Sequence, residues 1–168
     1  MDRDFYRRDV LEVAPELLGK YLVRVNGKGE VRRYMITETE AYRGTEDLAC
    51  HASKGRTRRT EVMFSEGGVL YIYLIYGMYW MINIVTAGKD QPQAVLLRGV
   101  EGINGPGRLG RAMEVDKSFN GEDLVLSDRF WVTESGLALP YTTGVRIGVD
   151  YAGEWKDKPW RFIARLPG

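Results

Sequence analysis

The residues best suited to chemistry are a tyrosine and two carboxylates at alternating positions, Glu38, Glu40 and Tyr42. Side chains two residues apart lie on the same face of an extended strand, so all three share one side. Two carboxylates there are compatible with a solvent-exposed strand face. The alternative is a carboxylate partly buried beside an aromatic wall, because desolvation would raise its pKa toward that of a general base.

The chain contains one histidine, His51, and one cysteine, Cys50, directly after a loop that follows this strand. His51 is either a structural hydrogen-bonding residue or part of a site at the strand end. A single cysteine cannot form an internal disulfide, and these two residues give too few soft ligands for a zinc site. We therefore expect no metal and no cofactor.

A run of cations lies between His51 and the most apolar stretch of the chain. Its members are Lys54, Arg56, Arg58 and Arg59. The run is either a solvated loop or a set of contacts to nucleic-acid phosphates. Lysine and arginine number 24 against 23 acids, so this local concentration favours the second interpretation. Gly107 and Arg108, where a loop enters a helix, are either a second candidate anion cradle or a plain helix start.

The stretch from Val69 to Val85 carries no formal charge and is rich in aromatic and β-branched residues, which favour strands. Two residue sets alternate along its first part, Leu70, Ile72 and Leu74 against Tyr71, Tyr73 and Ile75. Tyr76-Gly77-Met78 breaks the run, which predicts a hairpin with Tyr76 at its tip. The stretch is too short and too rich in tyrosine to span a bilayer.

Two residues of this hairpin are poorly explained by folding alone. Tyr76 lies where the chain should turn in solvent. Asn83 lies inside an otherwise apolar strand, where a buried amide needs hydrogen-bond partners or a ligand. Both are therefore candidate functional residues.

The remaining patterns predict short helices and several strands. Helical spacing runs from Tyr6 to Leu18, with Pro15 indicating a break or two short helices. Arg98 shares a strand face with apolar residues, and we expect Glu40 to be its acidic partner. The predicted strands are Tyr21–Val25, Val31–Tyr42, Gln93–Val100, Leu124–Val132 and Val145–Val149.

The chain has 168 residues, 44% of them hydrophobic and 28% charged, which is ordinary for one globular domain. We expect that domain to span residues 1–168. The charged start of the chain does not resemble a signal peptide. We expect an intracellular protein, with the nucleoid or cytoplasm of a prokaryote or the nucleus of a eukaryote as its place of work.

Several ordered motifs together resemble the alkyladenine (3-methyladenine) DNA glycosylases, and the resemblance covers nearly the whole chain. The motifs are Glu38-Thr39-Glu40-Ala41-Tyr42, His51, the segment from Gly68 to Tyr79, Asn83, Val95-Leu96-Leu97-Arg98, Gly105-Pro106-Gly107-Arg108-Leu109, Asp116-Lys117-Ser118-Phe119, Arg146-Ile147-Gly148-Val149, Ala152-Gly153-Glu154-Trp155 and Lys158-Pro159-Trp160-Arg161-Phe162. Together with the strand and helix pattern, the family resemblance implies an α+β domain. Its curved, mainly antiparallel sheet carries a protruding tyrosine-tipped hairpin and is flanked by helices.

The resemblance also implies roles for seven residues. Glu40 would activate the attacking water, and Arg98 would hold that water or orient the carboxylate. The flipped base would lie against Tyr42, His51 and Tyr73. The remaining two roles are those of Tyr76, which would fill the gap in the duplex, and Asn83, which would disfavour bases carrying the exocyclic amine of guanine.

The implied function is excision of alkylated or deaminated purines from damaged double-stranded DNA by a monomer without strand-cleaving activity. A non-catalytic nucleic-acid-binding module is a rival interpretation. A hydrolase of free nucleosides is another, with Glu38 and Glu40 as an acid/base pair. Side chains on one strand face cannot easily flank a scissile bond from both sides, which disfavours the latter.

Overall fold

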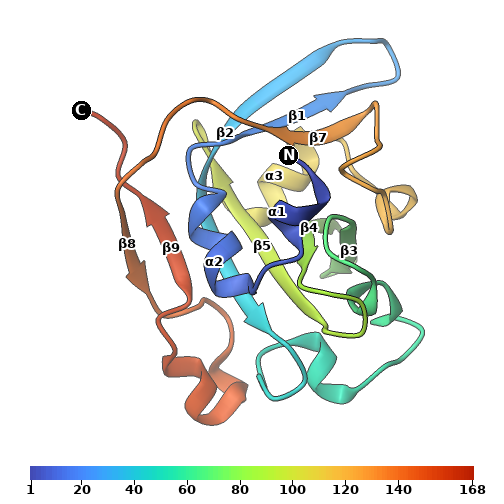
Figure 1. Ribbon diagram of the computed structural model, residues 1–168, viewed down its shortest axis with the longest axis vertical. Helices are drawn as coiled ribbons and strands as arrows, with labels where there is room; N and C mark the ends of the chain where they lie inside the picture. Colours follow the sequence, from blue (N-terminus) through green and yellow to red (C-terminus); the bar gives the residue numbers. More distant parts are fainter.

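A nine-stranded antiparallel sheet curls through the computed structural model, which describes residues 1–168 (Figure 1). The strand order is β3-β4-β5-β2-β1-β7, with β6 paired to β5, β9 to β2 and β8 to β9. The strands are β1 Tyr21–Val25, β2 Val31–Arg43, β3 Leu70–Ile75, β4 Tyr79–Thr86, β5 Gln93–Val100, β6 Ile103–Asn104, β7 Phe130–Thr133, β8 Tyr141–Gly144 and β9 Arg161–Ala164. The expected α+β class, the antiparallel sheet and the hairpin are confirmed.

The helices are few and short. They are α1 Arg3–Tyr6, α2 Val10–Glu16 and α3 Pro106–Ala112, with the 3-10 turns η1 His51–Lys54, η2 Glu61–Phe64, η3 Lys117–Phe119 and η4 Asp150–Asp157. The Asp9 side chain caps α2 by accepting a hydrogen bond from the Leu11 amide. The break expected at Pro15 is wrong, because α2 runs through Pro15 to Glu16, and α2 is the one helix that lies within the segment from Tyr6 to Leu18. Pro15 has no amide hydrogen to donate, and α2 ends one residue later, at Glu16.

An irregularity in β2 decides which of its residues face the core. The pairing of β2 with β5 shifts register around Glu38, and such a bulge changes which positions point to each side. Before the shift Ile36 belongs to the core, and after it Ala41 does. Glu38, Glu40 and Tyr42 are thereby left on the opposite face.

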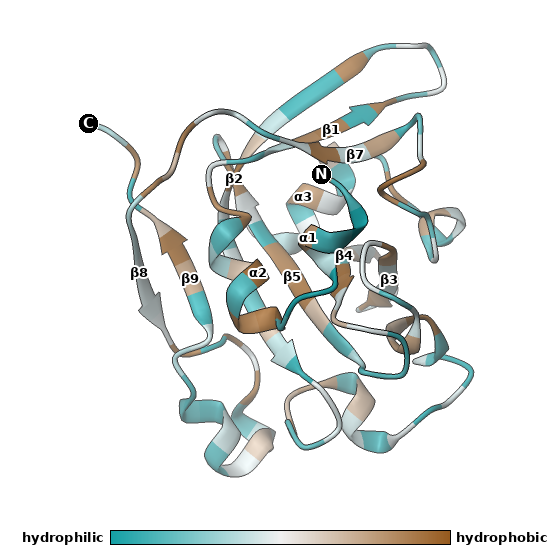
Figure 2. Cartoon of the chain, in the orientation of Figure 1, coloured by the Kyte–Doolittle hydropathy of each residue, from teal (hydrophilic) through white to brown (hydrophobic).

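One face of the sheet therefore carries the main core, against which α2 and α3 pack. Ile72 of β3, Ile84 of β4 and Leu97 of β5 lie in this core. Figure 2 shows hydrophobic segments along α2 and β5, whereas the outer part of the β1–β2 hairpin is largely hydrophilic. The residues between the core positions face the other way and line the site described below.

Helix α3 packs closely on β4 because it presents glycine at the contact. A Cβ atom at Gly110 would lie 2.0 Å from the carbonyl oxygen of Trp80. One at Gly107 would lie 2.7 Å from the ring of Tyr79. The two glycines hold α3 against the base of the hairpin.

Two strand predictions in the C-terminal third are wrong in whole or in part. Of residues 124–132, only the end is extended, as part of β7. Residues 145–149 form no strand, because the Arg146 side chain and the Ile147 amide are bound to residues far away in the sequence. No helix has both the length and the apolar character that crossing a membrane requires.

Candidate active site

A cavity of about 400 Å³ opens on the face of the sheet opposite the main core. Alternating residues of neighbouring strands line it, Tyr42 on β2, Tyr73 on β3, Asn83 on β4 and Arg98 on β5. His51 closes one side from η1. The residues selected from the sequence as base-binding therefore share one cavity with Arg98.

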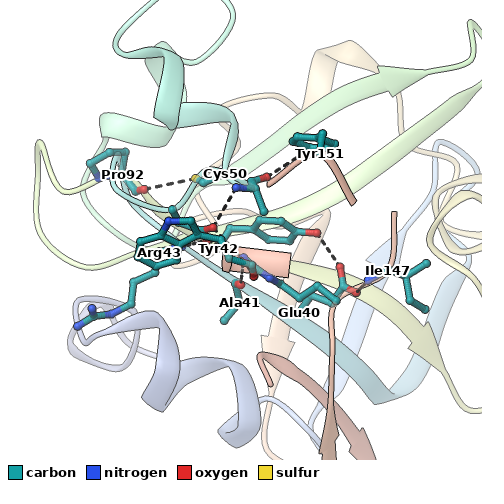
Figure 3. Close-up of polar contacts among 12 residues, drawn as sticks. Glu40, Ala41, Tyr42, Arg43, Cys50, Pro92, Ile147 and Tyr151 are labelled. Atoms are coloured by element: carbon teal, nitrogen blue, oxygen red, sulfur yellow. Dashed lines mark hydrogen bonds and ion pairs between the residues drawn. The ribbon is translucent and has the colours of Figure 1, made fainter. Parts of the chain in front are cut away.

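Glu40 is fully buried and does not itself line the cavity. Its carboxylate is held from two sides, as Figure 3 shows. The Tyr42 hydroxyl donates to Oε1 at 2.7 Å, and the Ile147 amide donates to Oε2 at 2.7 Å. Burial raises the pKa of Glu40, and the Arg98 charge and these two hydrogen bonds oppose the rise without cancelling it. A solvent-exposed strand face is therefore wrong for Glu40.

Arg98 lies between two carboxylates. Its Nη1 is 3.6 Å from Oε1 of Glu40, and its Nε is 3.5 Å from Oε1 of Glu38. The expected pairing of Arg98 with Glu40 is confirmed. Both separations are long for hydrogen bonds, and the buried Nε of Arg98 has no hydrogen-bond partner. The guanidinium therefore keeps donor capacity beside the cavity.

Aromatic rings form one wall of the cavity. The rings of His51 and Tyr73 meet edge to face, with centroids 4.5 Å apart. His51 Nδ1 lies 3.0 Å from the hydroxyl of Tyr71. Burial, together with the charges of Arg59 and Lys54, lowers the pKa of His51 to about 4. The imidazole is therefore neutral near pH 7, and one hydrogen bond fixes its orientation.

Asn83 has the partner that a buried amide needs. Its Nδ2 donates to the carbonyl of Tyr71 at 3.1 Å, directly across the β3–β4 pairing. This bond fixes the amide where it lines the cavity. Asn83 therefore bonds across the hairpin and also lines the cavity.

Tyr76 lies at the tip of the hairpin, as expected, and its side chain is 84% exposed. Its φ of 53° and that of Gly77, 65°, are the pattern of a type I′ turn. Tyrosine is unfavourable at positive φ, and its exposed ring gains little from the core. The neighbouring Met78 is also exposed, so the tip presents apolar surface beside the mouth of the cavity.

The basic run divides into free and paired cations. Arg56 is paired with Glu61 at 2.9 Å and with Asp90 at 3.0 Å. Arg59 lines the cavity, with its guanidinium 5.8 Å from the centre of the Tyr73 ring. Lys54 and Arg58 are exposed and have no carboxylate partner among the ion pairs.

Gly107 and Arg108 lie in the first turn of α3, beside a smaller groove next to Tyr76. Packing against Tyr79 already accounts for glycine at position 107. Arg108 is exposed. The two residues remain candidates for contact with DNA.

Sequence reasoning missed the structural support of the site. Asp47 and Arg146 form a fully buried ion pair that joins the loop after β2 to residues 145–149. Tyr71, Tyr151 and Cys50 also line the cavity and were not selected. Arg146 and Ile147 belong to a motif that carried the family resemblance, which was the available signal, but the period-two pattern assigned them to a strand.

Comparison with known proteins shows the family of the chain. The family model described as methylpurine-DNA glycosylase (MPG) matches residues 4–104 and 101–166. The chain belongs to this family. Its members act in DNA repair, which supports a DNA glycosylase with DNA as its partner.

Bacterial relatives match this methylpurine-DNA glycosylase family member over nearly its full length. A Legionella pneumophila protein, provisionally named as a 3-methyladenine DNA glycosylase, is 47% identical over 98% of this chain and 94% of its own. Proteins with the same provisional name from Rickettsia felis and Natranaerobius thermophilus are 43% and 41% identical. These two cover 99% and 98% of this chain, and 96% and 95% of their own length.

Proposed function

We propose that the protein flips alkylated or deaminated purines out of duplex DNA and hydrolyses the N-glycosidic bond with a water that Glu40 activates. The substrates would be of the 3-methyladenine, 7-methylguanine, hypoxanthine and etheno-adenine class. One observation carries the proposal. The only fully buried glutamate has a raised pKa, lies beside Arg98 and adjoins a tyrosine-lined cavity.

The cavity and the hairpin tip suit an extruded base. A purine inside a duplex cannot be reached, so the nucleotide must leave the stack at a cost of a few kcal/mol. A cavity of about 400 Å³ has the size typical of small-molecule sites. Stacking of Tyr76 in the vacated space would offset about 1–3 kcal/mol of that cost.

The aromatic wall favours the electron-poor rings of alkylated purines. Alkylation at N3 or N7 makes the purine cationic, and a desolvated cation–π contact stabilises it by about 2 kcal/mol. Tyr42 and Tyr73 supply the electron-rich aromatic faces for this contact. Because His51 is neutral, it adds no repelling charge. Asn83 would disfavour guanine by opposing its exocyclic amine.

Glu40 and Arg98 would act together on the water. A carboxylate with a raised pKa can accept the proton as the water attacks the sugar carbon. Its charge also stabilises the oxocarbenium character that develops there. Arg98 would orient either the water or the carboxylate. No residue that lines the cavity is a lysine, which supports hydrolysis without a Schiff base and without strand cleavage.

The decisive experiment compares Glu40→Gln with Glu38→Gln on duplexes that each carry one lesion. Both variants remove a carboxylate beside Arg98, so the second controls for the loss of an ion pair. We expect Glu40→Gln to abolish base release while the affinity for lesion DNA persists. Glu38→Gln should retain most of the release rate. The abasic product should stay uncleaved until it is treated with alkali.

The same assay distinguishes the rival functions. A non-catalytic DNA-binding module would show no base release by the wild-type protein. A nucleoside hydrolase would turn over the free nucleoside at least as well as the duplex, and it would lose activity in both variants. Size-exclusion chromatography with and without a lesion duplex would test the expected monomer and its double-stranded partner.

A further inference from the structure

The two terminal nitrogens of Arg146 each have two acceptors, whereas its buried Nε has no hydrogen-bond partner. Its two terminal nitrogens meet the Asp47 carboxylate at 2.5 and 2.9 Å. Nη1 also donates to the Ala41 carbonyl at 3.0 Å, and Nη2 donates to the Trp155 carbonyl at 2.9 Å. The guanidinium lies 4.9 Å from the ring centre of Tyr42. Arg146 therefore contacts Ala41, the residue after Glu40, and Tyr42, which is a wall of the cavity.

Asp47 is equally committed. Besides Arg146, its carboxylate accepts the amides of Arg43 and Ala49, each at 3.0 Å. Neither side chain of the pair has any exposed surface. A buried pair with all these bonds is fixed in one geometry, since losing either partner would leave an uncompensated charge. The end of β2, the loop that leads to His51 and residues 145–149 are thus fastened together.

Ile147, the residue after Arg146, contacts the Glu40 carboxylate through its backbone amide. The Ile147 amide donates to Oε2 of Glu40 at 2.7 Å, from a segment that is not part of the sheet. No ladder of backbone hydrogen bonds sets the position of that amide. The side chain of Arg146, one residue earlier, is the nearest fixed point.

We propose that the Arg146–Asp47 pair is a positioning device for the reaction, which holds the Ile147 amide against the Glu40 carboxylate. This inference rests on the proposed role of Glu40. Arg146 acts through Ile147 and through its own positive charge, which lowers the pKa of Glu40, and it touches no reacting atom. A lysine at position 146 would keep the positive charge but could not reach Asp47 and both carbonyls with one nitrogen.

Loss of this device should change the ionisation of Glu40, because hydrogen bonds to a carboxylate favour its charged form. Other groups that act on Glu40 remain in place when position 146 changes. They are Arg98 on β5, Glu38 and Tyr42 on β2, Tyr73 on β3 and Arg161 on β9, the last through Glu38. A lost amide bond should therefore raise the pKa of Glu40 toward the value that burial alone would give.

The test measures two quantities for wild type, Arg146→Lys and Asp47→Asn. The first is the titration of the Glu40 carboxyl by carbon NMR, assigned with Glu40→Gln, and the second is the pH profile of single-turnover base release. For Arg146→Lys we expect the Glu40 titration and the ascending limb of the profile to move up together by about one pH unit. Release at pH values below the shifted limb should fall by up to about tenfold, with lesion affinity changed less than threefold.

Two further proteins separate positioning from stability. Replacing Ile147 by its α-hydroxy acid turns the amide between residues 146 and 147 into an ester. This change removes the N–H donor to Glu40 and leaves Arg146 and Asp47 intact. It should therefore reproduce the shift of the Glu40 titration even if Arg146→Lys folds poorly. Arg24→Lys is the matched control, because Arg24 is a buried arginine that donates to the Met113 carbonyl away from the site. It should lower stability without moving the Glu40 titration.

An unmoved Glu40 titration in both the ester and Arg146→Lys would overturn the inference. So would an equal shift in Arg24→Lys. The NMR titration needs no catalysis, so these outcomes stay distinct from failure of the proposed function, which wild-type protein without base release would show.

Discussion

At the Glu40 side chain, burial and hydrogen bonding act in opposite directions. Burial favours the neutral acid, whereas Arg98, Tyr42 and the Ile147 amide favour the carboxylate. A general base needs both, since it must be ionised before reaction and must still attract a proton. The structure provides this balance in a residue with no exposed surface.

At the His51 side chain, the same reasoning gives a prediction about stability. In the folded protein the pKa of His51 is about 4, below its ordinary value near 6.5. As the pH falls below about 6.5, the unfolded chain gains a proton that the folded protein does not bind until about pH 4. The free energy of unfolding should therefore decrease over this range.

His51→Gln should remove that contribution, while its amide can still meet the Tyr71 hydroxyl. Urea unfolding at pH 7.5, 5.5 and 4.5 would measure the difference between the two proteins. We expect wild type to lose more stability than the variant between the first and last values. Parallel losses would contradict a buried, neutral histidine.

At the scale of the elements, the tip of the β3–β4 hairpin should contribute to DNA binding but little to the stability of the fold. Tyr76 has positive φ, which costs about 1–2 kcal/mol for a residue with a side chain. Tyr76→Gly should therefore leave the melting temperature unchanged or raise it, and Tyr76→Ala should change it little. Both variants should weaken binding to lesion duplex, as measured by fluorescence anisotropy. A large fall in melting temperature for either would show that the ring supports the fold.

Helix α3 gives a prediction of the opposite kind. Gly110→Ala would place a methyl group 2.0 Å from the Trp80 carbonyl oxygen, which has no room to move without disturbing β4. We expect a loss of about 3 kcal/mol in the free energy of unfolding, near the upper end of overpacking costs. Gly27→Ala is the control, because nothing lies within 4 Å of its Cβ position. That change should stay within about 0.5 kcal/mol.

Local pattern was sufficient for most of the sheet. The strand patterns of residues 21–25, 31–42 and 93–100 correctly predicted β1, β2 and β5. The alternation within β2 likewise placed Glu38, Glu40 and Tyr42 on one face. These features depend on residues near one another in sequence, so a single chain reports them.

Long-range contacts decided the elements that were predicted wrongly. Residues 145–149 alternate like a strand, but Arg146 is bound to Asp47, 99 positions earlier. That bond takes the segment out of the sheet and turns the Ile147 amide to Glu40. No pattern within the segment specifies either partner, so the support of the carboxylate became visible only in three dimensions.

At the scale of the whole molecule, the positions of the charged residues matter more for DNA binding than the net charge does. The formal net charge is +1, so long-range attraction to DNA is weak. Affinity must then come from local contacts to phosphates. Lys54 and Arg58 are free for this role, whereas Arg56 is already paired with two carboxylates.

The salt dependence of binding should distinguish these cations. Each phosphate contact contributes about 0.9 to the slope of log affinity against log salt concentration for duplex DNA. Lys54→Ala and Arg58→Ala should each reduce the slope by about that amount in titrations from low to moderate salt. Arg56→Ala should leave the slope nearly unchanged. Wild-type slopes in Lys54→Ala and Arg58→Ala would show that these two cations do not contact the backbone.

The only thiol of the chain has a consequence for a protein proposed to work where DNA is being alkylated. Cys50 is buried, and burial raises its pKa to about 12 from an ordinary value near 9, so the thiolate form is strongly disfavoured. Electrophiles that methylate purines attack thiolates far faster than thiols. The cavity wall thus contains a sulfur that the damaging agent scarcely modifies, and the protein is equipped to outlast the chemical exposure that creates its substrates.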